Sequence, residues 1–271
     1  MALPPAERAS PAAGAVELLS PPQDPAFPEE WYELSAPDHF WFEWRLRAFL
    51  RQARCLGLSV DGPLRALDVG AGSGVLRDQI EARAGWTVDI ADVSARALVR
   101  ARPGRGRVLC YDVLEPAAAL LGRYDVVLLF DVLEHIASPR PFVQAVSRHL
   151  RPGGHLFVNV PAGQWLFGPY DVAAGHVRRY DRASLTAELA TSDLDLRDLR
   201  YWGLSLVPLL FARKLLVRSA ASSDDCVRRG FAPPGRLVHA LLHAALRAET
   251  SVLARPVLGT SLLLAGRRRG A

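Results

Sequence analysis

The feature that most constrains the fold is a glycine-rich turn at residues 70–74, with the sequence Gly-Ala-Gly-Ser-Gly. An apolar run over residues 64–69 precedes it, and a run with helical character over residues 75–84 follows it. This order predicts a strand, a tight turn and a helix. Glycine accepts positive φ and has no side chain, so the backbone N–H groups of such a turn can approach a ligand closely. The turn therefore predicts an α/β fold with a ligand site at the end of a strand.

The spacing of the glycines indicates which kind of ligand the turn binds. A dinucleotide-binding turn has the pattern G-x-G-x-x-G. Here the third glycine falls one residue early, at Gly74, and Val75 stands where that pattern needs glycine. An acid, Asp68, lies two residues before the first glycine. The pattern favours a ligand with a ribose and no pyrophosphate, which makes a nicotinamide dehydrogenase the weakest alternative.

Three later apolar segments also end at an acid. Strands that alternate with helices predict a mainly parallel sheet, in which ligands bind at the carboxyl ends of the strands. We therefore expect these acids and Asp68 to converge on one site, with the acid about 20 residues beyond the glycines accepting the ribose hydroxyls. The segments and acids are residues 88–92 with Asp92, residues 107–111 with Asp112, and residues 124–130 with Asp131.

Four motifs in order carry a resemblance that covers roughly residues 31–205. They are the acid and glycine turn at 68–74, the strand-end acids that follow, DVVLLFDVLEHI at 125–136, and LRPGGHLFVNVP at 150–161. Together they resemble class I S-adenosylmethionine (SAM) dependent methyltransferases of the small-molecule type, a group that includes the ubiquinone and menaquinone methylases. The resemblance implies SAM as the cofactor, with the acid matching Asp112 on the adenine amine. The cofactor-binding residues that it implies are Asp68, Gly70, Ala71, Gly72, Gly74, Asp92, Val93, Asp112, Val113 and Asp131.

The same family has a Rossmann-like fold, so we expect a mainly parallel seven-stranded sheet with helices on both faces and a helical insertion before the last strand. The first 30 residues contain seven prolines, and such a segment buries too little apolar surface to offset its ordering entropy. The expected segments are a disordered tail (1–30), an N-terminal helical lid (31–60), the SAM-binding core (61–202), an apolar and basic helical insertion (203–257), and the last strand with a basic tail (258–271).

Positive charge is concentrated in the C-terminal part of the chain. Residues 203–271 hold eleven arginines and lysines against three acids, although the whole chain has a net charge of only +5. The apolar runs among them are shorter than the roughly 20 residues that span a bilayer. The segment 203–257 is expected either to contact a membrane peripherally or to cover the active site, and the two roles are compatible. Widely spaced cysteines indicate reduced thiols, and we expect a cytoplasmic protein that can lie at the inner membrane face.

Residues 164–181 contain most of the groups expected to bind and activate the methyl acceptor. His176 is the first candidate for a general base, because methyl transfer to oxygen or nitrogen usually removes a proton. His135 is the second candidate. Relatives with a Glu-x-x-Glu-His segment and a later histidine hold a divalent ion, but this chain has aspartate at the first position, and we expect no metal. The expected substrate-binding residues are Trp41, Tyr170, Arg178, Arg179 and Tyr180, although Arg179 and Tyr180 could instead brace the loop.

Three functions compete at this stage. The leading function is O-methylation of a small, lipophilic or natural-product acceptor. The apolar insertion is the feature that favours a lipophilic acceptor. A nucleic-acid methyltransferase is suggested by the pI of 9.5, but base-amine methylases carry an Asn/Asp-Pro-Pro-aromatic motif where this chain has residues 131–133, so we expect no nucleic-acid partner. A non-catalytic, membrane-docked protein of this fold is the third, and the intact glycine turn with Asp92 argues against it.

Overall fold

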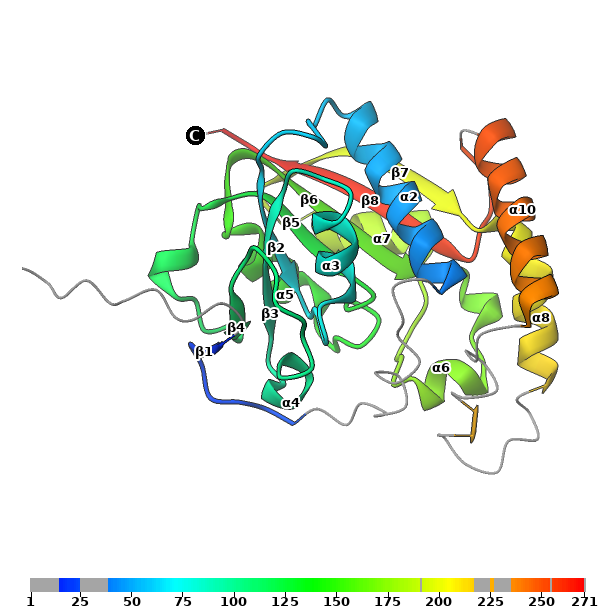
Figure 1. Ribbon diagram of the computed structural model, residues 1–271, viewed down its shortest axis with the longest axis horizontal. Coiled ribbons are helices and arrows are strands. Elements are labelled where there is room, and N and C mark those ends of the chain that lie inside the picture. Colours follow the sequence, from blue (N-terminus) through cyan, green and yellow to red (C-terminus); the bar gives the residue numbers. More distant parts are fainter. Residues whose placement is uncertain are drawn as a thin grey trace, which may run out of the picture.

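One eight-stranded sheet forms the centre of the molecule in the computed structural model (Figure 1). The structure describes residues 15–24, 39–190, 192–216, 225–226, 235–253 and 255–270. The strand order is β1-β4-β3-β2-β5-β6-β8-β7, and neighbours from β1 to β6 are parallel, whereas β8 is antiparallel to β6 and β7. The strands are β1 (Val16–Leu18), β2 (Arg65–Val69), β3 (Thr87–Asp92), β4 (Val108–Cys110), β5 (Tyr124–Phe130), β6 (Leu150–Pro161), β7 (Leu194–Trp202) and β8 (Ser261–Arg268).

The predicted parallel sheet with a final antiparallel hairpin is confirmed, but the sheet has eight strands and not seven. The additional strand, β1, lies within the segment predicted to be disordered, and that prediction is wrong for residues 15–24. Three residues between prolines give no strand signal. They become a strand because the edge of β4 offers unpaired backbone groups, and Val16 pairs in parallel register with Val108. The rest of the predicted tail lies outside the described residues.

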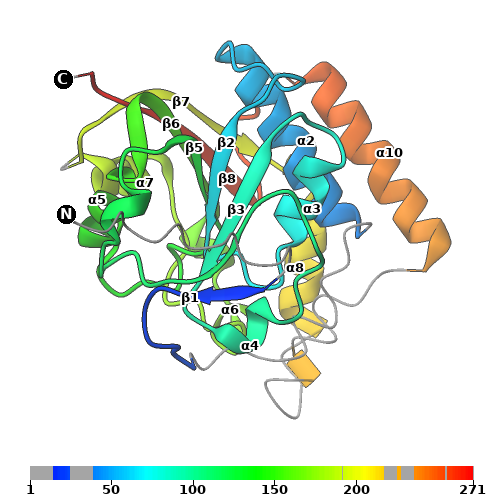
Figure 2. The ribbon, with the colours of Figure 1, turned by 60° about the vertical axis from the view of Figure 1, so that its left-hand side comes forward.

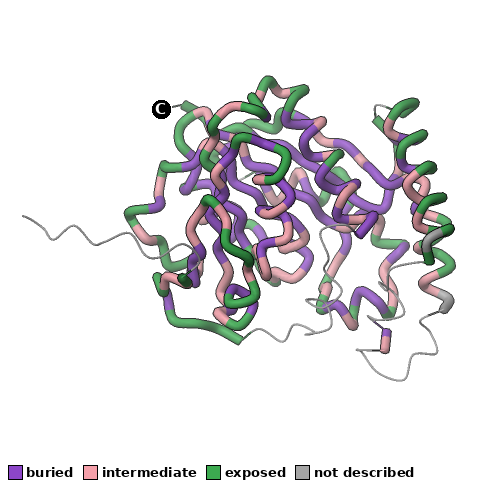
Figure 3. The backbone as a smooth tube through the Cα atoms, in the orientation of Figure 1, coloured by how far each residue is buried: buried purple, intermediate pink, exposed green. Residues whose placement is uncertain are grey.

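Helices cover both faces of the sheet, as predicted (Figure 2). Alternate residues of β5 point to opposite faces, so Val126 and Leu128 pack beneath α2 and α3, whereas Val127 and Leu129 pack against α5 and α7. The two apolar layers appear as the buried centre in Figure 3. The helices are α2 (Phe40–Cys55), α3 (Val75–Glu81), α4 (Ala95–Leu98), α5 (Pro139–Ser147), α6 (Pro169–Ala173), α7 (Arg182–Leu189), α8 (Val207–Leu216) and α10 (Arg236–Val252), with short helical turns η1 (Ala118–Leu120), η2 (Gln164–Leu166) and η3 (Leu204–Leu206).

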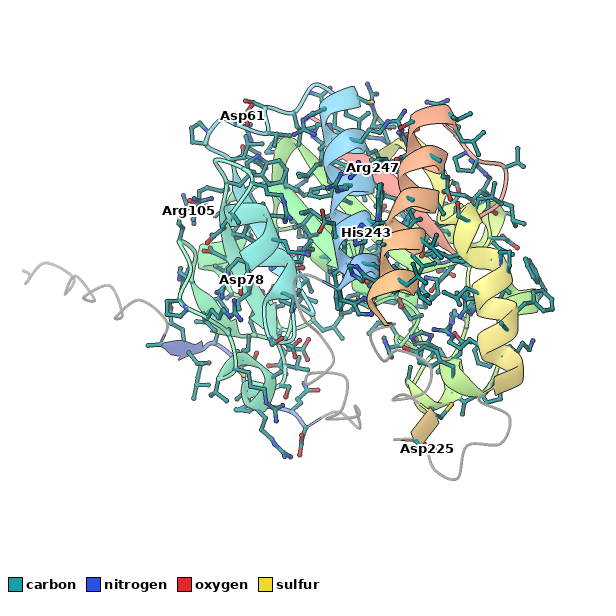
Figure 4. All side chains as sticks on the ribbon, turned by 45° about the vertical axis from the view of Figure 1, so that its right-hand side comes forward. Asp61, Asp78, Arg105, Asp225, His243 and Arg247 are labelled. Carbon is teal, nitrogen blue, oxygen red and sulfur yellow. The ribbon has the colours of Figure 1, made fainter. Side chains whose placement is uncertain are left out.

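The predicted helical insertion lies within the final hairpin, between β7 and β8, and supplies η3, α8 and α10. The Glu249 carboxylate on α10 holds the start of the insertion in place. It accepts hydrogen bonds from three consecutive backbone N–H groups at residues 203–205. α10 also docks on α2, where Trp44 Nε1 donates to His243 Nδ1 at 3.0 Å. Figure 4 shows His243 on the side of α10 that faces α2. No helix among the described residues is both long enough and apolar enough to cross a bilayer.

The predicted lid is represented by α2, which begins at Phe40 after the N-cap His39. Residues 31–38 of the lid lie outside the described part of the chain. One face of α2 is buried in the core, with Phe49 fully enclosed between the rings of Trp86, Phe130 and Phe157. The N-terminal half of α2 reaches the carboxyl edge of the sheet, where Trp41 lies next to Trp202. α2 therefore belongs both to the core and to the surroundings of the site.

Candidate active site

The glycine turn has the backbone shape that its sequence predicts. Gly70, Gly72 and Gly74 all have positive φ, at 71°, 56° and 78°. At Gly70 a side chain is also excluded by space, because a Cβ atom there would lie 2.5 Å from Cγ2 of Val132. The turn thus lies between β2 and α3 with Gly70 exposed and residues 71–73 half-buried, where a ligand can approach it.

Two of the predicted acids flank this turn. Asp92 ties the turn to the end of β3, because its two carboxylate oxygens accept the N–H groups of Gly72 and Ser94, each at 2.8 Å. Burial raises the pKa of Asp92. Asp68 lies deeper, with 3 % of its surface exposed, and burial raises its pKa to about 7 against the opposing charges of Arg45 and Arg77. A buried acid of this kind is ready to ionise when a cation binds beside it.

The other predicted cofactor residues lie in the glycine turn or just after β3 and β4, and they differ in what they can offer a ligand. Asp112 follows β4 at the sheet edge, and its carboxylate is held by Leu114 N and Gln23 Nε2. Val113 is buried in the core, so it can offer a ligand only its backbone. Val93 accepts a hydrogen bond from Gln23 N through its own carbonyl oxygen, and Ala71 packs at the rim of a small apolar cluster.

Asp131 is the centre of a buried polar network at the end of β5. It is the one non-glycine residue of the described chain with positive φ, at 57°. Arg45 Nη1 lies 2.5 Å from its Oδ2, and Asn159 Nδ2 donates to its Oδ1 at 2.8 Å. Trp202 Nε1 in turn donates to Asn159 Oδ1. Burial raises the pKa of Asp131, and the charge of Arg45 opposes this.

Arg45 and Asn159 belong to this site, although neither was expected from the sequence. The Arg45 guanidinium lies over the rings of Trp41, Phe42 and Phe130, at 4.9 to 5.4 Å from their centroids. The helical spacing of Trp41 and Arg45 could have placed them on one face of the helix. A polar Asn159 within the apolar run of β6 was a second usable signal, because buried polar groups need partners.

His176 and Asp171 form a hydrogen-bonded pair in the loop after β6. His176 Nδ1 lies 2.9 Å from Asp171 Oδ1, and since a carboxylate only accepts, the neutral imidazole carries its proton on Nδ1. Its Nε2 atom lies 3.9 Å from Glu134 Oε1. Burial raises the pKa of Asp171, but hydrogen bonds and charges from His176 and Arg179 outweigh it, so the pKa lies below its ordinary value. Asp171 is thus a charged partner that orients His176.

His135 and Glu134 face the same histidine. The His135 and His176 rings meet edge to face with centroids 4.9 Å apart. His135 Nδ1 lies 3.1 Å from the Gly175 carbonyl oxygen, which places its proton on Nδ1. Burial, followed by the neighbouring His176, lowers the pKa of His135 to about 4, so this imidazole is neutral at physiological pH. Burial raises the pKa of Glu134 well above its ordinary value.

These three side chains could also hold a divalent ion. One potential ligand atom from each of Glu134, His135 and His176 lies within 4.8 Å of the others. Both histidines hydrogen-bond through Nδ1, which is how metal-bound imidazoles are usually oriented, and Glu134 Oε2 is buried without a hydrogen-bond partner. Two imidazoles and one carboxylate suit a transition metal or zinc. The donor set therefore fits an ion, whereas both oxygens of Asp131 are already engaged.

The predicted substrate residues 178–180 lie beside the histidines and brace the loop. Arg179 is buried and donates to Asp171 Oδ1, and Tyr180 is buried with its hydroxyl donating to the Leu133 carbonyl oxygen. Arg178 donates to the Ala137 carbonyl oxygen. These contacts support the bracing alternative for Arg179 and Tyr180, and direct binding of a substrate by any of the three stays a prediction.

Trp41 and Tyr170, the other predicted substrate residues, meet in a separate apolar cluster with Phe42 and Cys226. The Tyr170 hydroxyl is buried without a hydrogen-bond partner, and Arg213 of α8 lies 3.8 Å from its ring centroid. Lys214 of the same helix donates to the Trp165 carbonyl oxygen at 3.2 Å. The insertion therefore reaches the loop that carries His176.

The fold and this site together define the class. A parallel sheet with a final antiparallel hairpin, a left-handed glycine turn after β2 and acids at the ends of the next two strands are the parts of a class I SAM-dependent methyltransferase, with SAM as the cofactor. A family model described as "Methyltransferase domain" matches residues 31–199. The chain belongs to this methyltransferase family.

Known relatives agree with this assignment. The chain is 40% identical over 111 residues to a ubiquinone biosynthesis O-methyltransferase of Cronobacter sakazakii, covering 38% of this chain and 45% of the relative. It is 34% identical over 149 residues to the protein of the same name from Caulobacter vibrioides, covering 49% and 58%. The chain thus matches about half the length of these relatives. Its fold is similar to that of Haemonchus contortus phosphoethanolamine N-methyltransferase 2 in complex with SAM, with TM-score 0.53, 17% identity, and coverage of 82% and 52%.

Proposed function

We propose that this protein transfers a methyl group from SAM to a hydroxyl oxygen of a small lipophilic acceptor, with His176 as the general base. When bound, SAM supplies the methyl group from its sulfonium centre. The observation that carries the proposal is the 2.9 Å hydrogen bond between Asp171 and His176 Nδ1, in the loop that follows β6 at the carboxyl edge of the sheet.

The chemistry assigned to His176 follows from its tautomer. With the proton on Nδ1, the Nε2 atom carries a lone pair that can remove the proton of an acceptor hydroxyl. The charged Asp171 favours the imidazolium that results, and Arg179 keeps this carboxylate ionised in a buried position. The neutral His135 beside it does not add a second positive charge. The pair thus resembles the histidine and carboxylate of other general-base enzymes in its geometry.

Two observations support a lipophilic acceptor. The relatives that match this chain are named ubiquinone biosynthesis O-methyltransferases, and the insertion next to the site presents apolar side chains. On the outer face of α10, Leu237, Val238 and Leu241 have 74%, 46% and 60% of their surface exposed. Exposed apolar stripes of this kind are typical of helices that bind a partner or a membrane surface.

We further propose that α8 and α10 contact a membrane peripherally, so that the acceptor can be taken from the bilayer. On α8, Leu209 and Phe211 have 40% and 50% of their surface exposed, whereas Arg213 and Lys214 contact Tyr170 and Trp165. The arginines of residues 267–269 do not belong to this surface, because antiparallel β8 carries them to the opposite edge of the sheet.

A bound divalent ion is an alternative route to the same reaction. Glu134, His135 and His176 would hold it, and a metal lowers the pKa of a hydroxyl bound to it. Chelation separates the two routes. Transfer that is lost with EDTA and restored by Zn²⁺ or a divalent transition metal supports the ion, and transfer that survives EDTA supports His176 as a base acting directly.

The test of the function uses SAM with a labelled methyl group. The protein is incubated separately with a lipid extract and with the soluble metabolites of its source cell, and Asp92→Ala serves as the inactive control. Label in the lipid fraction that is lost in the control supports the proposal. Label only in soluble metabolites contradicts the lipophilic acceptor. Binding of SAM with no transfer to either fraction supports the non-catalytic alternative.

Membrane contact has its own test. Sedimentation with vesicles containing anionic lipid is compared for the wild type and for Leu237→Asp with Leu241→Asp, which lie on the exposed face of α10. An exposed apolar residue on another surface, Leu114, provides the matched control as Leu114→Asp. Equal sedimentation of all three proteins would contradict the docking surface.

A further inference from the structure

The described N-terminal segment crosses the outer edge of the sheet where β4 ends (Figure 1). After β1, the N–H groups of Leu19 and Ser20 both donate to the Cys110 carbonyl oxygen, at 2.9 and 3.2 Å. Gln23 N then donates to the Val93 carbonyl oxygen at 2.8 Å. Residues 19–24, called the strap below, therefore connect the ends of β4 and β3 from the outside.

The side chains of the strap converge on Asp112. Ser20 is buried, and its Oγ accepts the Asp112 backbone N–H at 2.5 Å. Gln23 Nε2 donates to Asp112 Oδ2 at 2.9 Å, and Leu114 N donates to Oδ1 at 2.9 Å. Each carboxylate oxygen thus has one hydrogen bond and keeps a second lone pair for another donor. The strap fixes the position and rotation of this acid from a point about 90 residues away in sequence.

The place of Asp112 in the sheet indicates what that further donor is. Asp92 is the acid expected at the ribose, and it pairs in register with Cys110, two residues before Asp112. A nucleoside whose ribose lies at the end of β3 and whose base points away from the glycine turn therefore extends toward the end of β4. In the described part of the chain, β1 is the one strand beyond β4, so the strap borders the position of the base.

We propose that the strap is part of the cofactor site, and that Gln23 is a positioning residue that presents Asp112 to the exocyclic amine of adenine. The proposal rests on the expected contact between Asp112 and adenine. A carboxylate held in this way accepts from an amine and repels a carbonyl oxygen, so the strap selects adenine over a base that has a carbonyl at that position. The N-terminal segment then contributes to nucleoside specificity.

The test compares two probes, S-adenosylhomocysteine and S-inosylhomocysteine, which carry an amine and a carbonyl at the position in question. Their affinities are measured by calorimetry for the wild type and for Gln23→Met, which preserves side-chain length. We expect the adenosyl compound to bind about fivefold more weakly to the variant, from the loss of one solvent-exposed hydrogen bond to a charged group. The inosyl compound should bind within twofold of the wild type or better.

Asp24→Ala is the matched control, because Asp24 lies on the same strap and makes an exposed ion pair with Arg96 at 3.2 Å, away from Asp112. It should change neither affinity by more than about twofold, as expected for an exposed pair. Equal weakening of both probes by Gln23→Met would show a merely structural role and overturn the proposal, as would no weakening at all.

Asp112→Ala distinguishes failure of the strap from failure of the underlying assignment. If this variant loses the preference for adenine and Gln23→Met keeps it, Asp112 reads the base without help from the strap. If Asp112→Ala also keeps the preference, the contact between Asp112 and adenine is wrong, and the inference about Gln23 falls with it. Gln23 is exposed, so Gln23→Met does not disturb the core.

Discussion

Removing the imidazole of His176 is the most direct test of the proposed base. In His176→Gln the side chain keeps a polar end but cannot take a proton. General-base catalysis contributes about 10²- to 10⁴-fold, so kcat should fall by that factor, equivalent to about 2.7–5.5 kcal/mol. Binding of S-adenosylhomocysteine should remain within about twofold, because the expected cofactor residues lie at the ends of β2, β3, β4 and β5 and not in this loop. The assay is transfer of labelled methyl to the acceptor fraction that proves active.

Asp171→Asn extends the test, because Asp171 acts on the reaction only through His176. Its kcat should fall by a similar factor, and the double variant should be no slower than the slower single variant, since the two side chains work as a unit. The two single variants should differ in stability. Asp171→Asn leaves the buried Arg179 without its counter-ion, which should lower the free energy of unfolding by about 3–5 kcal/mol. Val177→Ala, at an exposed neighbour, is the control. A His176→Gln enzyme within threefold of the wild type, or losses that add in the double variant, would refute the assignment.

Three further outcomes follow from the buried charges. Burial raises the pKa of Asp68 to about 7, and a cationic cofactor favours the ionised form of this acid. The affinity for SAM should therefore rise with pH through neutrality. Calorimetry in buffers of different ionisation enthalpy should detect a proton released on binding, and this release should be absent in Asp68→Asn. Arg45→Met leaves Asp131 without its buried partner and should lower the free energy of unfolding by about 3–5 kcal/mol. The exposed control Arg47→Met should lower it by less than about 1 kcal/mol. Equal urea midpoints for the two variants would contradict this expectation. Burial, followed by the nearby His239, lowers the pKa of His243, whose Nδ1 accepts a hydrogen bond from Trp44. The free energy of unfolding should therefore fall as the pH drops below about 6.5, because the unfolded chain binds this proton first. His243→Gln should weaken this pH dependence in urea titrations.

Local sequence patterns determined the fold class and the position of the ligand site. The turn at residues 70–74 needs glycine because its φ values are positive, and that requirement is visible in the sequence itself. The apolar segments that end at Asp92, Asp112 and Asp131 are short-range features, and the rule that ligands bind at the carboxyl ends of parallel strands converts them into one site. The family resemblance added the cofactor, which the spacing alone left open between nucleoside ligands.

The contacts that orient these groups could not be read from the sequence. Arg45 and Asp131 are 86 residues apart, and Gln23 and Asp112 are 89 apart, so their pairing depends on how helices and edge segments pack on the sheet. β1 gave no signal because three residues carry no periodicity, and the strand exists only through its pairing with β4.

The pair formed by Asp171 and His176 shows both what the sequence determines and what only the tertiary structure decides. Sequence supplied a histidine of suitable chemistry in a loop after β6, and it offered several polar neighbours for it. The tertiary structure decided which one orients the ring, because α6 and the buried Arg179 hold Asp171 Oδ1 against Nδ1. Sequence fixes chemistry and short-range geometry through backbone preference and periodicity. Long-range partners are decided by packing, since it is burial in the folded molecule that makes each charge require a particular neighbour.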